Sequence, residues 1–142
     1  MWLLNFAAAR NESVSLAAGD WILYLDADEA IVPASGPFLR ELVADGRSPD
    51  GKARAYTVLV RSETAHGTTE DMQSRLWENV AGVRFRGAIH ESIEASPEVS
   101  LSVVNAASVV IDHLGYRPEV MESRQKLRRN ATLLAAAIDA FS

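Results

Sequence analysis

Apolar residues recur along this chain with two spacings that alternate. Over 5–18 they fall near one face of a helix, with Asn5 suited to cap its start and Gly19 suited to the residue after its end. The run 21–25 that follows is apolar throughout, which is typical of a strand buried on both faces. A helix that leads directly into such a strand is half of a β-α-β crossover, so we expect parallel strands here.

The same reasoning predicts the remaining elements. A short helix is expected at 38–43, closed by Gly46, and an alternating strand at 55–61. The polar segment 62–73 predicts a loop that could act as a lid or contact an acceptor. Further strands are predicted at 75–78, 83–93, 99–104 and 108–113, and a long terminal helix with a near-heptad apolar stripe at 118–142.

Composition limits the class of protein. The 142 residues fit a single domain, 1–142, with 48% hydrophobic and 23% charged residues. A net charge of −5 argues against a nucleic-acid binder, and the lack of cysteine excludes disulfides and thiolate metal sites. No apolar run approaches the roughly 20 residues of a membrane span, so we expect a cytoplasmic protein without a transmembrane segment.

Three carboxylates, Asp26, Asp28 and Glu29, end the strand at 21–25. In an extended backbone Asp26 and Asp28 point to the same side, where they repel unless a cation lies near them. Mg²⁺ or Mn²⁺ suits such carboxylates together with substrate phosphates, and Mn²⁺ tolerates an imidazole better. The acids therefore predict a metal-dependent site for a nucleotide-linked substrate, with a solvated turn as the alternative interpretation.

Longer motifs follow one another along nearly the whole chain. They are Phe6-Ala-Ala-Ala-Arg10-Asn11-Glu12, the run 19–29, Arg75-Leu76-Trp77-Glu78-Asn79, Phe85-Arg86-Gly87-Ala88-Ile89-His90-Glu91, Asp112-His113-Leu114-Gly115-Tyr116 and Lys126-Leu127-Arg128-Arg129-Asn130. In this order they resemble the family 2 glycosyltransferases with the GT-A fold, in the branch whose catalytic domain is often followed by tetratricopeptide-like repeats. The resemblance implies an α/β fold: a partial GT-A (Rossmann-like) mixed sheet flanked by helices, with a long C-terminal helix.

The resemblance also implies a function. It predicts a metal-dependent, inverting transfer from a nucleotide-diphosphate sugar, a UDP-sugar above all, to an acceptor whose identity stays open. Carried over by residue, Arg10 would approach the nucleotide and Asp26 would lie near the ribose and the metal. Asp28 and His113 would complete the metal site. A core histidine is the alternative interpretation of His113.

A carboxylate base is expected to take the proton of the acceptor. Glu91 is the first candidate, because it lies on the otherwise apolar face of a predicted strand, with His90 beside it to bind or orient the acceptor. Asp71 is the rival base. An edge-strand acid paired with Arg84 or Arg86 is the alternative for Glu91.

Family members begin with further strand and helix units before the helix at 5–18, of roughly 60 residues or more. We therefore expect a truncated catalytic domain with exposed strand edges. Such a chain is expected to form homo-oligomers through those edges or through the C-terminal helix. The alternative function is a non-catalytic remnant or oligomerising interaction module of the same fold.

Overall fold

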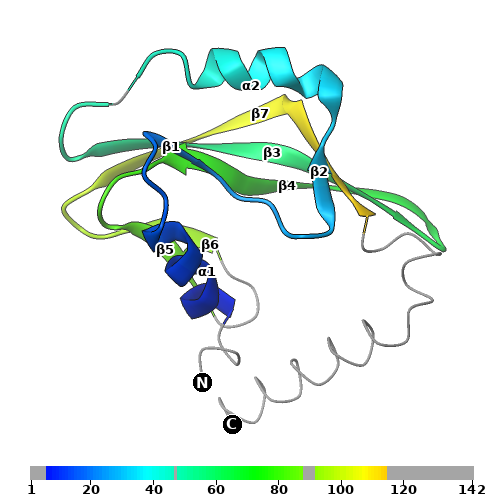
Figure 1. The fold of residues 1–142 in the computed structure, drawn as a ribbon, viewed down its shortest axis with the longest axis horizontal. Helices are drawn as coiled ribbons and strands as arrows, with labels where there is room; N and C mark the ends of the chain where they lie inside the picture. The colour runs from blue at the N-terminus through cyan, green and yellow to red at the C-terminus, as the bar shows by residue number, and fades with distance from the viewer. Residues whose placement is uncertain (1–5, 47, 88–91, 115–142) are drawn as a thin grey trace, which may run out of the picture.

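The fold centres on a five-stranded sheet that curls strongly (Figure 1). The computed structural model describes residues 6–46, 48–87 and 92–114. The strand order is β1-β4-β3-β7-β2, with β3 and β7 parallel and the other neighbours antiparallel. The five strands are β1 (Trp21–Leu23), β2 (Glu29–Ile31), β3 (Lys52–Thr64), β4 (Gly67–Glu78) and β7 (Ser100–His113). A second, two-stranded sheet consists of β5 (Val83–Arg86) and β6 (Ser92–Ala95).

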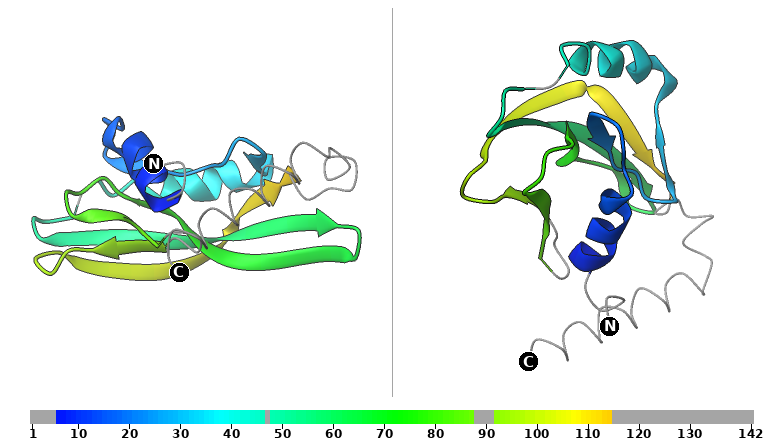
Figure 2. Two further views of the ribbon diagram at one scale, coloured as in Figure 1. Left: turned by 90° about the horizontal axis from the view of Figure 1, so that it is seen from below. Right: turned by 60° about the vertical axis from the view of Figure 1, so that its left-hand side comes forward.

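Two α-helices accompany these sheets in the described ranges. Helix α1 (Phe6–Ser15) lies beside the small β5–β6 sheet (Figures 1 and 2). Asn11 of this helix exchanges two hydrogen bonds with the backbone of Phe85. Helix α2 (Gly36–Leu42) follows the 3₁₀ turn η2 (Pro33–Ser35) and lies along β7. Neither helix, nor any other that the structure describes, is long and apolar enough to cross a bilayer.

The hydrophobic core has two parts. One gathers around Trp77, whose indole meets Phe85 edge-on with ring centroids 5.2 Å apart. The other joins β3 to β7 through Val58, Val109 and neighbours, and is covered by apolar side chains of α2. Burial of these side chains on both sides of the long strands explains why the sheet, rather than a layer of helices, dominates the fold.

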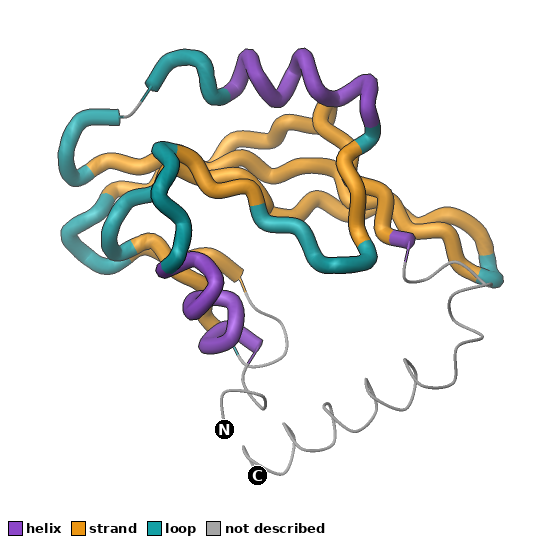
Figure 3. Tube along the Cα trace, in the orientation of Figure 1, coloured by secondary structure: helices purple, strands orange, loops and turns teal. Residues whose placement is uncertain are grey.

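The predicted α/β class is wrong. Strands make up most of the described chain, and its α-helices are two and short (Figure 3). The segment 62–73, predicted as a loop, instead extends β3 and β4 into a long hairpin that turns between Thr64 and Gly67. Its threonines favour a strand, and a two-residue connection makes a tight hairpin, so polarity alone was a poor guide.

Other predictions divide in the same way. The helix over 5–18, the short helix near 38–43 and the strands beginning at Trp21 and within 55–61 are confirmed in position. The parallel crossover is wrong, because β1 pairs antiparallel with β4 and lies at the end of the sheet. The single strand predicted at 83–93 is replaced by β5 and the start of β6, which pair with each other, and the strands predicted at 99–104 and 108–113 are one continuous strand, β7. The predicted helix at 118–142 lies outside the described residues.

Candidate functional site

A cleft of about 760 Å³ opens between the turn after β1, the strand β4 and the end of β7. Most of its lining is polar. The side chains come from helix α1, the turn after β1 and the six strands β2 to β7, and include Arg10, Asp26, Glu29, Thr57, Ser62, Thr69, Asp71, Gln73, Ser74, Arg75, Phe85, Ser92 and His113. Strand β4 supplies the longest run, because it continues past β1, which covers only its last three residues.

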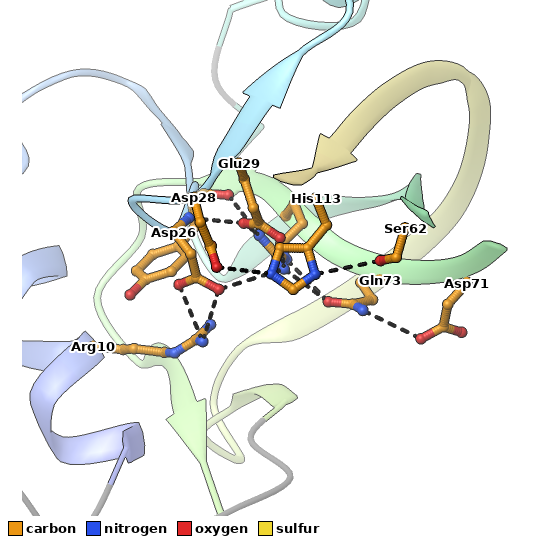
Figure 4. Close-up of polar contacts among 10 residues, drawn as sticks. Arg10, Asp26, Asp28, Glu29, Ser62, Asp71, Gln73 and His113 are labelled. Atoms are coloured by element: carbon orange, nitrogen blue, oxygen red, sulfur yellow. Dashed lines mark hydrogen bonds and ion pairs between the residues drawn. The ribbon is translucent and has the colours of Figure 1, made fainter. Parts of the chain in front are cut away.

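Asp26 lies on the cleft wall in contact with Arg10 (Figure 4). A terminal nitrogen of Arg10 is 3.2 Å from Oδ1 and 3.4 Å from Oδ2 of Asp26. The guanidinium also lies over the ring of Tyr24, 4.7 Å from its centroid, and near the ring of Phe85. Two residues that the sequence predicted for donor binding therefore lie together, and aromatic faces fix the arginine.

Asp28 and His113 form the second polar pair of the site. His113 Nε2 is 3.2 Å from Asp28 Oδ2, and its Nδ1 is 3.3 Å from Oγ of Ser62. Strand pairing sets this geometry, because Glu29 is opposite His113 in the β2–β7 ladder and the N–H of Leu114 donates to the carbonyl of Asp28. Residues 85 positions apart in the chain thus meet at one corner of the sheet.

The part of the chain that the structure describes contains no preformed three-ligand metal site. Among the residues that the structure describes, no three His, Cys, Asp or Glu side chains are grouped so as to hold an ion. Asp26 contacts Arg10, and its Oδ2 is 4.0 Å from Arg75, so its carboxylate is paired with cationic side chains. The predicted ligands Asp26, Asp28 and His113 are therefore not grouped as one three-ligand site, and metal binding by them stays a prediction. The Asp28–His113 separation of 3.2 Å matches the roughly 3 Å between adjacent ligands of an octahedral cation.

Glu29 and Arg75 form a buried ion pair behind the cleft wall. Their side chains are 1% and 6% exposed, and both terminal nitrogens of Arg75 bind the Glu29 carboxylate. Burial raises the pKa of Glu29, but hydrogen bonds from Arg75 and from the backbone N–H of Asp26 outweigh it, so the pKa lies below the ordinary 4.5. The pair holds the turn that carries Asp26.

Sequence reasoning gave no role to this pair or to Gln73. Gln73 Oε1 accepts from Nε and Nη2 of Arg75, and its Nε2 is 3.3 Å from Oδ2 of Asp71. A signal was present in the sequence: an arginine directly before Leu76 and Trp77 on a buried strand requires an anionic partner. Glu91 and His90, the predicted base and its neighbour, lie outside the described residues.

A TPR repeat-containing protein of Synechococcus elongatus is 33% identical to the chain over 135 residues, which cover 90% of this chain and 32% of that protein. The chain thus spans about a third of the length of this relative. No family model matches the chain.

These comparisons overturn the family assignment. The relative is named for its repeats and not for a glycosyltransferase activity, and no family model supports the assignment. In the described part of the chain, the fold is mostly β-sheet with two short α-helices. Membership of the family 2 glycosyltransferases is therefore wrong. The motifs that suggested it still meet in space: the turn with Asp26 and Asp28, Arg75 and His113 all border or support one cleft.

Proposed function

We propose that the cleft binds a nucleotide-diphosphate sugar and supports transfer of its sugar to a hydroxyl group of an acceptor. The observation that carries this proposal is the joining of the Arg10–Asp26 and Asp28–His113 pairs by one turn at one polar cleft. A volume of about 760 Å³ lies in the range of small-molecule sites and suits a ligand of this size.

Arg10 is the residue suited to the diphosphate. Guanidinium groups bind phosphate oxygens in a bidentate manner, and the aromatic faces of Tyr24 and Phe85 orient this one. Its ion pair with Asp26 is partly exposed, with side chains 20% and 32% accessible, so a phosphate can compete for the same nitrogen atoms. Asp26 would then accept hydrogen bonds from ribose hydroxyls.

The carboxylates of the cleft would repel a diphosphate in the absence of a counter-charge. A divalent cation, Mn²⁺ or Mg²⁺, therefore belongs to the proposal, with Asp28 and His113 as its two protein ligands and the donor phosphates completing the shell. When bound, such an ion neutralises the charge of the departing diphosphate.

A carboxylate on the acceptor side would accept the hydroxyl proton as the sugar is displaced. Asp71 lines the cleft and is available for this role, and Glu91 stays a prediction. Displacement in one step would invert the configuration at the sugar carbon.

Isothermal titration of UDP-glucose into the full chain, with Mn²⁺ present, tests the proposal. We expect saturable heat that is abolished when Mn²⁺ is omitted or Asp28 is changed to Asn. Glu94→Gln serves as the matched control, because Glu94 is an exposed carboxylate on β6 that pairs with Arg86 away from the cleft. Absence of heat at millimolar donor and Mn²⁺ would show that the chain does not bind this donor.

A non-catalytic interaction module is the second candidate. The relative is named for TPR repeats, which are pairs of helices about 34 residues long. The described part of this chain has α-helices of 10 and 7 residues and is not such an array, so its interaction surfaces would be the sheet ends at β1 and β2. Light scattering over a dilution series tests this: concentration-dependent oligomers support the module, and a monomer throughout excludes oligomerisation.

A further inference from the structure

We propose that Asp71 and Gln73, on the β4 side of the cleft, form a recognition subsite for the hydroxyl groups of a neutral carbohydrate. In the proposed transfer this carbohydrate is the acceptor, and to that extent the inference rests on the proposed function. Both side chains line the same cleft as Arg10 and His113, and Figure 4 shows them at the end of the row of contacts opposite to Arg10, with His113 between. The subsite is therefore distinct from the donor end.

The orientation of the Gln73 amide is determined by chemistry. Arg75 has donors only, and its Nε and Nη2 lie 3.2 Å and 2.9 Å from one atom of the amide. That atom must be the carbonyl oxygen, so the amide nitrogen faces the other way. It donates to Oδ2 of Asp71 at 3.3 Å.

Arg75 itself has no freedom to turn. Its side chain is 6% exposed, and its five N–H groups are matched by five hydrogen bonds: two to Glu29, two to Gln73 and one to the carbonyl of Tyr24. Burial lowers the pKa of Arg75, but Glu29 raises it by more, so the guanidinium stays charged. Gln73 is thus preorganised by the same ion pair that holds the turn of Asp26.

The chemistry of the pair selects its ligand. Gln73 offers amide hydrogens beside the carboxylate oxygens of Asp71, and a hydroxyl group both donates and accepts, so adjacent hydroxyls satisfy both partners. The hydroxyl of Thr69 lines the cleft next to them. Asp71 repels phosphate, and its exposed carboxylate disfavours a lipid chain at this position. A sugar or similar polyol is the class that remains.

The test follows the side-chain amide of Gln73 by ¹⁵N-resolved NMR in the full chain, with Gln73→Leu used to assign its signals. Methyl β-glucoside and cellobiose are titrated without donor or metal. We expect a saturable shift of the Gln73 amide, and about tenfold weaker binding in Asp71→Ala, corresponding to the loss of about one charged hydrogen bond.

Glu70→Ala is the matched control, since Glu70 precedes Asp71 on β4, is exposed and does not line the cleft. Arg75→Lys tests the positioning: it keeps the charge beside Glu29 but removes the fork, so the sugar-dependent shift should weaken while the chain stays folded. The inference is overturned if neither sugar moves the Gln73 amide, if Asp71→Ala and Glu70→Ala bind alike, or if inorganic phosphate produces the shift instead. Because the sugar titration contains no donor, its result is independent of whether UDP-glucose binds, and failure of one proposal can be told from failure of the other.

Discussion

Glu78 and Glu29 are both buried carboxylates held by an arginine, but the two arginines make their other contacts in different regions of the molecule. Glu78 is fully buried and binds Arg54 together with the backbone N–H groups of Ser48 and Arg54. Arg54 continues to the carbonyl of Gly46 and the face of Trp21, which closes the loop before β3 onto the sheet.

Arg75, the partner of Glu29, continues to the backbone of Tyr24 and to Gln73 at the cleft. Both glutamates have pKa values below the ordinary 4.5, because hydrogen bonds from arginine and backbone N–H groups outweigh the burial that raises the pKa. Similar electrostatics thus stabilise a loop in one region and orient ligand-facing groups in the other. Substitutions in the two pairs should therefore have different effects: loss of Glu78 should lower stability alone, and loss of Glu29 should lower both stability and ligand binding.

Glu78→Gln should have the largest effect on stability. The substitution removes the fully buried carboxylate that Arg54 binds at 3.0 Å and leaves the exposed Asp45, 3.9 Å away, as its anionic neighbour. Removing one partner of a buried pair typically costs about 3 to 5 kcal/mol. Urea unfolding followed by tryptophan fluorescence measures this loss. Sugar and donor affinities of the folded fraction should not change, because the pair does not border the cleft. A loss below about 1 kcal/mol would mean that the backbone donors, not Arg54, carry the interaction.

Glu29→Gln should cost less stability but should also weaken binding. Gln can still accept the N–H of Asp26, so a loss of about 2 to 3 kcal/mol is expected, smaller than for Glu78. Without the carboxylate, Arg75 is free to pair with Asp26, whose Oδ2 is already 4.0 Å away, and that contact competes with Arg10. Calorimetry with UDP-glucose and the Gln73 amide shift should both change. If Glu29→Gln is destabilised but binds as the unchanged protein does, the Glu29–Arg75 pair has only a structural role, like the Glu78–Arg54 pair.

Acid should destabilise the protein through both carboxylates. A depressed folded-state pKa contributes stability that is fully present above the unfolded value near 4.5 and is lost as pH falls through the folded value. Each unit of depression is worth about 1.4 kcal/mol. Unfolding free energies measured from neutral pH down through the acid range should therefore fall, and Glu78→Gln should show a smaller fall. An equal fall in that variant would assign the acid sensitivity to other groups.

Sequence periodicity predicted local elements better than their arrangement. The helix at α1 and the strand β1 follow from apolar spacing, but the spacing does not state which strand pairs with which, so the antiparallel β1–β4 pair was missed. The outer part of β4 is polar and lacks the apolar alternation by which a strand is predicted from sequence. The outer part of β4 is held by backbone pairing with β3 across the hairpin turn, and this pairing does not require an apolar face.

The candidate site was predictable where acids follow a strand. Arg10, Asp26, Asp28 and His113 were named from motifs and meet at the cleft. Gln73 and the Glu29–Arg75 pair were missed because their role depends on β4 reaching the turn after β1, which no local pattern shows. A carboxylate and an arginine 46 positions apart become partners only through the sheet.

The smallest expected effect comes from a third arginine–glutamate pair, and it isolates the role of burial. Arg86 Nε lies 3.3 Å from Oε2 of Glu94 across the β5–β6 sheet, with both side chains more than half exposed. Water and salt screen such a pair, so a double-mutant cycle of Arg86→Ala and Glu94→Ala should give a coupling of about 0.5 kcal/mol that disappears at high salt. The pairing chemistry matches that of Glu29 and Glu78, and the difference is solvent access. A coupling as large as that of the buried pairs would show that pairing itself, rather than desolvation of the partner left behind, sets the energies in all three regions.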